Sequence, residues 1–302
     1  MTPASVRQAV NDGTIALATP SEQRLPVVLS SPHSGRAYPP TFLQQARLTG
    51  LDLRRSEDCF IDEIFRPAAD MGAPMVHALF PRAFVDANRE PLELDPAMFV
   101  DALPARANVR SPRVAAGLGT IPRVVAQGQE IYRGRLRVAD AMARIRDYYQ
   151  PYHTALRHLV DQTLQRFGYC LLIDCHSMPS GGAAVGSKTS VTMSDVDFVL
   201  GDNYGGSCAA QVTEVATAWL RAAGYRVTRN APYAGGFTTR HYGKPHAGVH
   251  ALQVEINRSL YMNEARLIRN RRLPGLAAEM AKLVSDVGAI DPDQLRLPHA
   301  AE

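Results

Sequence analysis

The chain has 302 residues, of which 46% are hydrophobic and 21% are charged. This composition excludes a disordered, collagen-like or coiled-coil protein. The net charge is +4, from 33 Lys and Arg against 29 Asp and Glu, and the two signs are mixed along the chain, which argues against a nucleic-acid partner.

The sequence also bears on localisation and domain organisation. No apolar run approaches the roughly 18 residues of a membrane span, and residues 1–12 lack the apolar core of a secretion signal. We therefore expect a cytoplasmic protein that does not bind a membrane. Gly and Pro residues are scattered and mark no linker, so we expect one domain over residues 1–302.

Apolar runs rich in β-branched residues alternate with helical patterns along the chain. The runs predict strands at 25–31, 73–79, 83–87, 168–174, 197–200, 225–228 and 249–256. Helical periodicity predicts helices at 56–71, 138–167, 207–223 and 263–287. This alternation predicts an α/β fold, with a mostly parallel sheet covered by helices.

Three polar residues are expected at the ligand-binding edge of this sheet. In open α/β sheets, ligands bind beyond the carboxyl ends of the strands. His33 and His176 come just past the ends of predicted strands, and Glu255 lies near the end of its own. The topology therefore predicts that these three side chains converge.

Two of these residues are candidate metal ligands. A catalytic zinc site usually has three His, Asp or Glu ligands and an open position for water. His176 and His33 could supply two ligands, and Asp58, which lies 25 residues after His33, could supply the third. The alternative for Asp58 is structural, because residues 56–58 also resemble the cap and first turn of a helix.

Carboxylate and guanidinium groups suggest further roles. Glu255 stands in an apolar strand, where loss of water could raise its pKa towards that of a working general base; the alternative is an inward ion pair with Arg258 or Arg240. An arginine near residues 82–89 could bind a substrate carboxylate by two parallel hydrogen bonds. The alternative there is a surface ion network. The polar residues of this group are Arg82, Asp86, Asn88 and Arg89.

The cysteines and glycines point to no other cofactor. Cys59, Cys170, Cys175 and Cys208 lack the spacing of a structural zinc site. Cys175 adjoins a histidine, which leaves a cysteine nucleophile as an alternative, although its surroundings are apolar. No Gly-rich stretch matches a nucleotide-binding motif.

Several of these segments together resemble the N-formylglutamate amidohydrolase family. The resemblance runs in order from residue 27 to residue 262, with residues 1–24 and the helix at 263–287 as extensions. The segments that carry it are Pro32-His33-Ser34-Gly35, Glu57-Asp58, Asp62-Glu63, Asp86-Ala87-Asn88-Arg89, Asp174-Cys175-His176-Ser177, Gly201-Asp202, Thr239-Arg240-His241-Tyr242-Gly243, Gln253-Val254-Glu255 and Tyr261-Met262.

The resemblance implies a fold and a set of site residues. The family is similar to zinc carboxypeptidases and aspartoacylase, which implies a single α/β domain with a mixed, largely parallel sheet and one zinc ion per chain. It implies that His33, Asp58 and His176 hold the zinc and that Glu255 is the general base. Because residue 36 is an arginine, the His-x-x-Glu pattern of the carboxypeptidases is absent, and Glu57 remains a rival to Asp58.

The resemblance also implies how substrate binds. Asn88 and Arg89 map onto residues that hold a substrate carboxylate, with help from Arg240, and Arg82 maps onto an arginine that steadies the oxyanion. Another divalent metal could occupy the same ligand set.

The activity implied is hydrolysis of N-formyl-L-glutamate, a small-molecule substrate, to formate and L-glutamate in histidine degradation. Two alternatives stay open: another N-acyl amino acid or peptide amide as substrate, and a non-catalytic carboxylate-binding protein of the same fold. The sequence is compatible with either a monomer or a homo-oligomer. Residues 1–24 and 103–119 match no motif of the family and could reshape the pocket.

Overall fold

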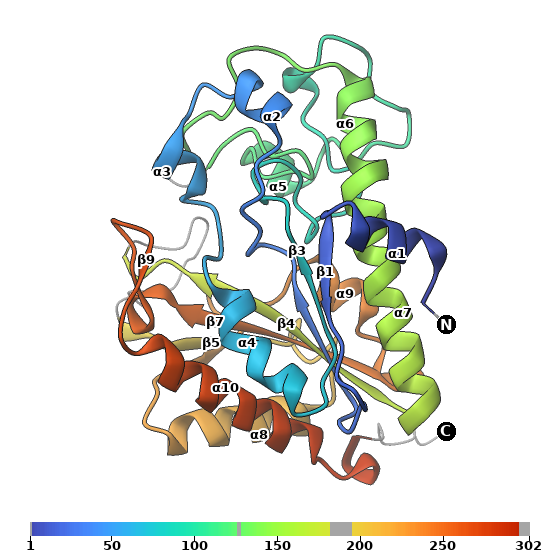
Figure 1. Cartoon of the computed structure of the whole chain (residues 1–302), viewed down its shortest axis with the longest axis vertical. Helices are drawn as coiled ribbons and strands as arrows, with labels where there is room; N and C mark the ends of the chain where they lie inside the picture. Colours follow the sequence, from blue (N-terminus) through green and yellow to red (C-terminus); the bar gives the residue numbers. More distant parts are fainter. Residues whose placement is uncertain (1, 126–127, 182–194, 296–302) are drawn as a thin grey trace. The chain divides into compact units, whose positions relative to one another are not determined.

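The computed structural model describes residues 2–125, 128–181 and 195–295 (Figure 1). Contacts between Cα atoms divide the chain into two compact units. The first comprises Met1–Leu17, Pro32–Cys59 and Val76–Arg157, and the second comprises Ala18–Ser31, Phe60–Met75 and His158–Glu302. A single domain over 1–302 stays a prediction.

A seven-stranded sheet has the strand order β1-β3-β2-β4-β7-β5-β6. Strands β2, β4 and β7 are parallel neighbours, whereas β5 runs antiparallel to β7 and parallel to β6. The predicted α/β fold with a mixed, largely parallel sheet is therefore confirmed. The strands are β1 (Ile15–Ala18), β2 (Val27–Ser31), β3 (Met75–Ala78), β4 (Cys170–Met178), β5 (Phe198–Gly201), β6 (Val227–Arg229) and β7 (Val249–Asn257), and β8 (Met262–Asn263) pairs with β9 (Ile268–Arg269) in a small separate sheet.

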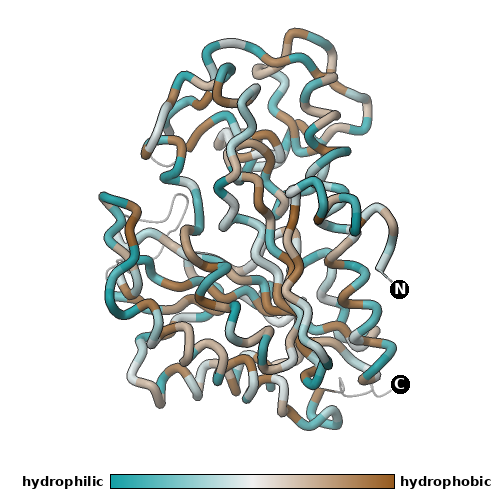
Figure 2. The backbone as a smooth tube through the Cα atoms, in the orientation of Figure 1, coloured by the Kyte–Doolittle hydropathy of each residue, from teal (hydrophilic) through white to brown (hydrophobic). Residues whose placement is uncertain are grey.

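The central strands of the second unit are buried along their whole length. Every residue of β2, β4 and β7 is buried, as expected for parallel strands covered on both faces. Hydrophobic residues, brown in Figure 2, recur along these strands. The polar residues in them are therefore desolvated, and each needs a hydrogen-bonding partner.

Helices α4, α8 and α10 are neighbours in the second unit (Figure 1), where α10 packs against the other two. Leu276, Met280, Leu283 and Val287 recur at helical spacing on the buried face of α10. The α-helices are α1 (Ala4–Asn11), α2 (Pro40–Gln45), α3 (Gly50–Arg54), α4 (Ile61–Asp70), α5 (Pro112–Ala115), α6 (Val138–Arg144), α7 (Gln150–Phe167), α8 (Ala210–Ala222), α9 (Phe237–Tyr242) and α10 (Leu273–Gly288). Ile145–Tyr149 is a π-helical turn between α6 and α7, and short 3₁₀ helices occur at Pro96–Met98, Pro245–Ala247, Arg258–Leu260 and Pro292–Leu295.

Three predicted helices begin later than expected, and the one at 207–223 begins at Ala210. The helix at 56–71 begins at Ile61, because Phe60 adopts a left-handed conformation with φ of 66° that cannot continue a helix. The helix at 263–287 begins at Leu273, followed by Pro274 in its first turn, where proline is favoured. Residues 262–269 instead contain β8 and β9.

Two strand predictions were wrong. Residues 83–87 form turns and irregular backbone, and Asp86 N–H donates to Thr120 O. Strand β4 does not end at residue 174 but continues to Met178. His176 therefore lies inside β4, two residues before its end, and not beyond the strand. No helix in the described part of the chain is both long enough and apolar enough to cross a membrane.

Candidate active site

His33 stands between two carboxylates in the first unit. It follows the last residue of β2 by two positions, and it is 2% exposed. Its Nε2 lies 2.7 Å from Oδ1 of Asp86, and its Nδ1 lies 3.4 Å from Oδ2 of Asp58. A neutral imidazole carries one N–H, so donation from Nε2 to Asp86 leaves the Nδ1 lone pair facing Asp58.

Asp58 and Glu57 have different surroundings. Asp58 is buried, and its backbone N–H donates to His33 O at 3.0 Å, which holds the two residues side by side. Glu57 is also buried but accepts three hydrogen bonds from the guanidinium of Arg54 and one from the hydroxyl of Tyr38. Because α4 begins only at Ile61 and its cap accepts no side-chain hydrogen bond, the expected capping alternative for residues 56–58 is wrong.

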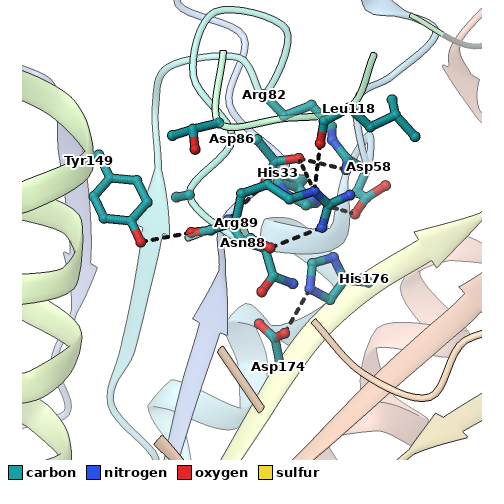
Figure 3. Close-up of polar contacts among 12 residues, drawn as sticks. His33, Asp58, Arg82, Asp86, Asn88, Arg89, Leu118, Tyr149, Asp174 and His176 are labelled. Atoms are coloured by element: carbon teal, nitrogen blue, oxygen red, sulfur yellow. Dashed lines mark hydrogen bonds and ion pairs between the residues drawn. The ribbon is translucent and has the colours of Figure 1, made fainter. Parts of the chain in front are cut away.

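Asp86 is the centre of a buried ion network (Figure 3). Its Oδ2 accepts from Nη2 of Arg82 at 2.9 Å and lies 3.8 Å from Nε of Arg89, while its Oδ1 also accepts from the backbone N–H of Asn88. Burial by itself would raise the pKa of Asp86, but His33, Arg82 and Arg89 hold that pKa well below its ordinary value. Asp86 is therefore an ionised acceptor, and Arg82, which we expected at the oxyanion, donates to it.

Arg89 is held by backbone carbonyls. Its Nε donates to Leu118 O at 2.9 Å, and its Nη1 donates to Asn88 O at 3.0 Å. Burial lowers the pKa of Arg89 to about 10, so the side chain stays charged at neutral pH. The guanidinium is thus a fixed cation whose Nη2 takes part in neither of these two bonds, which suits the binding of a carboxylate.

His176 and Glu255 are neighbours in the second unit. They are register partners in the parallel pair β4 and β7, so both side chains lie on the same face of the sheet. Nε2 of His176 lies 3.0 Å from Oδ2 of Asp174, two residues earlier on that face (Figure 3). Oε1 of Glu255 accepts from Nε2 of Gln253 at 2.8 Å. The expected desolvation of Glu255 agrees with its burial.

The two arginines expected near Glu255 differ in environment. Arg258 is buried, and its Nε donates to Oγ of Ser177 at 3.1 Å. Arg240 lies on α9 and is exposed. Its role in substrate binding stays a prediction.

Cys175 has the properties of a packed thiol. It is buried, its Sγ donates to Ile173 O at 3.4 Å, and burial raises its pKa well above the ordinary value. A protonated thiol is a poor nucleophile. All four cysteines are buried and none forms a disulfide.

Each candidate histidine ligand has a buried aspartate at its Nε2, Asp86 for His33 and Asp174 for His176. Metal-binding histidines usually donate their second N–H to a carboxylate in this way. Among the described residues, His33, Asp58 and His176 form a buried group whose side chains could hold a metal ion. This nitrogen and oxygen donor set fits zinc.

Sequence reasoning missed the roles of two residues that support this site. Asp174 was named only as part of the segment Asp174-Cys175-His176-Ser177, with no role of its own, and Leu118 lies in the stretch 103–119 that matched no motif. Leu118 contributes through its carbonyl, which no residue pattern signals. Asp174 could have been found from its spacing, because residues two apart on a strand share a face.

The fold and these side chains define an α/β protein with a polar site at the carboxyl ends of parallel strands. A family model described as N-formylglutamate amidohydrolase matches residues 25–262. The chain belongs to the N-formylglutamate amidohydrolase family.

Individual relatives agree with this assignment. An N-formylglutamate deformylase of Pseudomonas putida is 31% identical over 248 residues, which cover 80% of this chain and 83% of the relative. One from Pseudomonas aeruginosa is 29% identical over 251 residues, covering 80% and 84%.

Solved structures agree as well. The crystal structure of N-formylglutamate amidohydrolase from Ralstonia eutropha JMP134 has a TM-score of 0.86 and 33% identity, and the match covers 91% of this chain and 97% of that one. A gene product of Agrobacterium tumefaciens, with a TM-score of 0.63 and 19% identity over 93% of this chain and 98% of that one, shares the fold.

Proposed function

We propose that this protein is a zinc-dependent amidohydrolase that converts N-formyl-L-glutamate and water to formate and L-glutamate. The observation that carries the metal is the pair of buried aspartate-histidine contacts, because they leave the Nδ1 atoms of His33 and His176 as the ligand atoms. The names of the two Pseudomonas relatives support the substrate.

His33, Asp58 and His176 would hold the ion, and Glu57 would remain bound to Arg54. When bound there, zinc would polarise the formyl carbonyl and lower the pKa of a bound water. Asp86 and Asp174 would fix the tautomer and the orientation of both imidazoles.

Glu255 would serve as the general base. It takes a proton from the attacking water and delivers it to the leaving nitrogen, so that glutamate departs as a neutral amine. The hydrogen bond from Gln253 fixes its rotamer. Such positioned proton transfer contributes roughly 10² to 10⁴ in rate.

Asn88 and Arg89 would bind a substrate carboxylate. Arg89 is buried, charged and fixed by two carbonyls, so a carboxylate binds without first ordering the side chain. Arg240 is exposed on α9 and would assist with the second carboxylate. Arg82 donates to Asp86 and would add its positive charge next to the oxyanion. This positioning would place the scissile carbonyl for attack.

The test is formate release from N-formyl-L-glutamate by the purified protein, before and after chelation and with zinc added back. N-acetyl-aspartate and N-acetyl-glutamate run in parallel. We expect turnover that chelation abolishes and zinc restores, highest on the formyl substrate. Stoichiometric zinc without turnover would point to another amide substrate. Absence of both metal and turnover would point to a carboxylate-binding protein. Activity that is lost on thiol alkylation but survives chelation would point to a cysteine hydrolase.

A further inference from the structure

The segment that carries Asn88 and Arg89 has no regular secondary structure. Its buried backbone groups lack the hydrogen bonds of a sheet or helix and need other partners. Three of its carbonyls, those of Phe84, Ala87 and Arg89, accept hydrogen bonds from side chains of the helical stretch formed by α6, the π-helical turn and α7.

The three donors are Arg144, Tyr149 and His153. Nη1 of Arg144 donates to Phe84 O at 3.1 Å, the hydroxyl of Tyr149 donates to Arg89 O at 2.7 Å, and Nε2 of His153 lies 2.8 Å from Ala87 O. Because a carbonyl only accepts, Nε2 of His153 carries the proton. The Tyr149 and His153 rings also contact each other, with centroids 4.3 Å apart.

The π-helical turn explains how these donors share one face. Arg144 and Tyr149 are five residues apart, which in an α-helix would place them about 140° away from alignment. The π turn closes with a bond from Gln150 N–H to Ile145 O, five residues back, and so brings residues at this spacing closer to one face than an α-helix would. Tyr149 and His153, four apart, then continue the same face.

We propose that Tyr149 and His153 are positioning residues of the substrate carboxylate site. They hold the carbonyls of Ala87 and Arg89, on either side of Asn88, and so set the direction in which the Asn88 and Arg89 side chains leave the backbone. This inference rests on the proposed role of Asn88 and Arg89. It assigns a function to the π-helical turn, which neither the motif analysis nor the proposed chemistry uses.

The key variant is Tyr149→Phe, which removes one hydroxyl and keeps the ring. Tyr148→Phe is a matched control, since Tyr148 lies in the same turn and contacts the rings of Phe80 and Phe84. The loss of one neutral hydrogen bond predicts a KM for N-formyl-L-glutamate that rises about threefold to tenfold in Tyr149→Phe. We expect a smaller change in the kcat of Tyr149→Phe. Tyr148→Phe should keep the wild-type KM.

His153 provides a second test. A glutamine amide places a donor close to the position of Nε2, so His153→Gln should retain most of the affinity, whereas His153→Leu should raise KM as Tyr149→Phe does. Circular dichroism and thermal melting of each variant check that it folds. Equal losses in His153→Gln and His153→Leu would overturn the role of this hydrogen bond.

Substrate analogues separate positioning from general damage. N-formyl-4-aminobutyrate lacks the α-carboxylate, and N-formyl-L-glutamine has a neutral side chain. For the analogue that lacks the carboxylate held by Arg89, the KM ratio of Tyr149→Phe to wild type should fall to about 1. A ratio that is the same for all three substrates, or an equal effect of Tyr148→Phe, would overturn the proposal.

Calorimetric binding of glutarate, a plain dicarboxylate, distinguishes this inference from the proposed function. If the wild type binds glutarate but does not hydrolyse N-formyl-L-glutamate, the proposed reaction fails. The positioning role is then still supported if glutarate binds more weakly to Tyr149→Phe but not to Tyr148→Phe. If the wild type binds no glutarate, Asn88 and Arg89 form no carboxylate site and the inference is overturned.

Discussion

His176 on β4 and Glu255 on β7 are paired residue to residue in a parallel ladder. Adjacent strands lie about 4.8 Å apart, so this register places a candidate metal ligand beside the candidate general base. The preceding register pair on the same face is Asp174 and Gln253. Asp174 contacts His176 along β4, and Gln253 donates to Glu255 along β7. The sheet therefore sets both the spacing and the orientation of the two functional groups.

This pairing predicts separable effects on metal binding and catalysis. Glu255→Gln keeps the side-chain shape but cannot take a proton, so we expect full metal content with kcat reduced about 10² to 10⁴-fold. His176→Ala removes a ligand, and both metal and activity should be lost. The checks are metal analysis by mass spectrometry and formate release, and normal activity in either folded variant would contradict the assignment.

Asp58 and Glu57 can be distinguished by the same measurements. Asp58→Asn should lose most bound metal, because the amide is a weaker ligand than a carboxylate. Glu57→Gln should keep the metal but unfold at a lower temperature, because Glu57 is buried and accepts from Arg54 and Tyr38. The reverse pattern of metal loss would make Glu57 the ligand.

Arg89→Lys tests whether the guanidinium geometry matters beyond its charge. Lysine keeps the charge but cannot bond both Leu118 O and Asn88 O while facing a carboxylate. Hydrogen bonds to charged groups predict a KM about 10 to 150 times higher. Arg110→Lys, at an exposed position outside the site, is the control, and steady-state kinetics on N-formyl-L-glutamate provide the comparison. An unchanged KM in Arg89→Lys would remove Arg89 from the carboxylate site.

His250 predicts how stability depends on pH. Burial lowers its pKa to about 4, whereas an unfolded histidine has a pKa of about 6.5. Between these values the unfolded chain binds a proton that the folded chain does not, so the free energy of unfolding falls as pH falls from about 6.5 to about 4. The part of this loss that comes from His250 should disappear when the residue cannot titrate.

The variant for this test is His250→Asn. Nδ1 of His250 accepts from Ala209 N–H at 3.1 Å, and the asparagine oxygen offers a similar acceptor. Urea unfolding at pH 7.5, 6.0, 5.0 and 4.5 should give a shallower fall in stability for the variant than for the wild type. Parallel curves would show that His250 does not contribute to the acid sensitivity.

The main strands and the α/β class follow from local patterns. Runs such as 25–31 and 249–256 are apolar enough to be buried on both faces, and the polar residues that interrupt such runs are easily singled out. His33, His176 and Glu255 were found in this way. The helix at 56–71 was predicted with the wrong start, because a left-handed residue at Phe60 has no signal in hydrophobic periodicity.

The sequence by itself determined the central strands, the main helices and the chemical types available to the site, because hydrophobic period and residue identity are properties of short segments. Only the tertiary structure decided that Tyr38 donates to Glu57, that His176 is paired with Glu255, and that Arg89 is held by Leu118 O. The tertiary structure also decided that the Tyr149 hydroxyl donates to Arg89 O. Such contacts join residues distant in the chain, often through backbone carbonyls that every residue possesses, so packing and not residue type selects them.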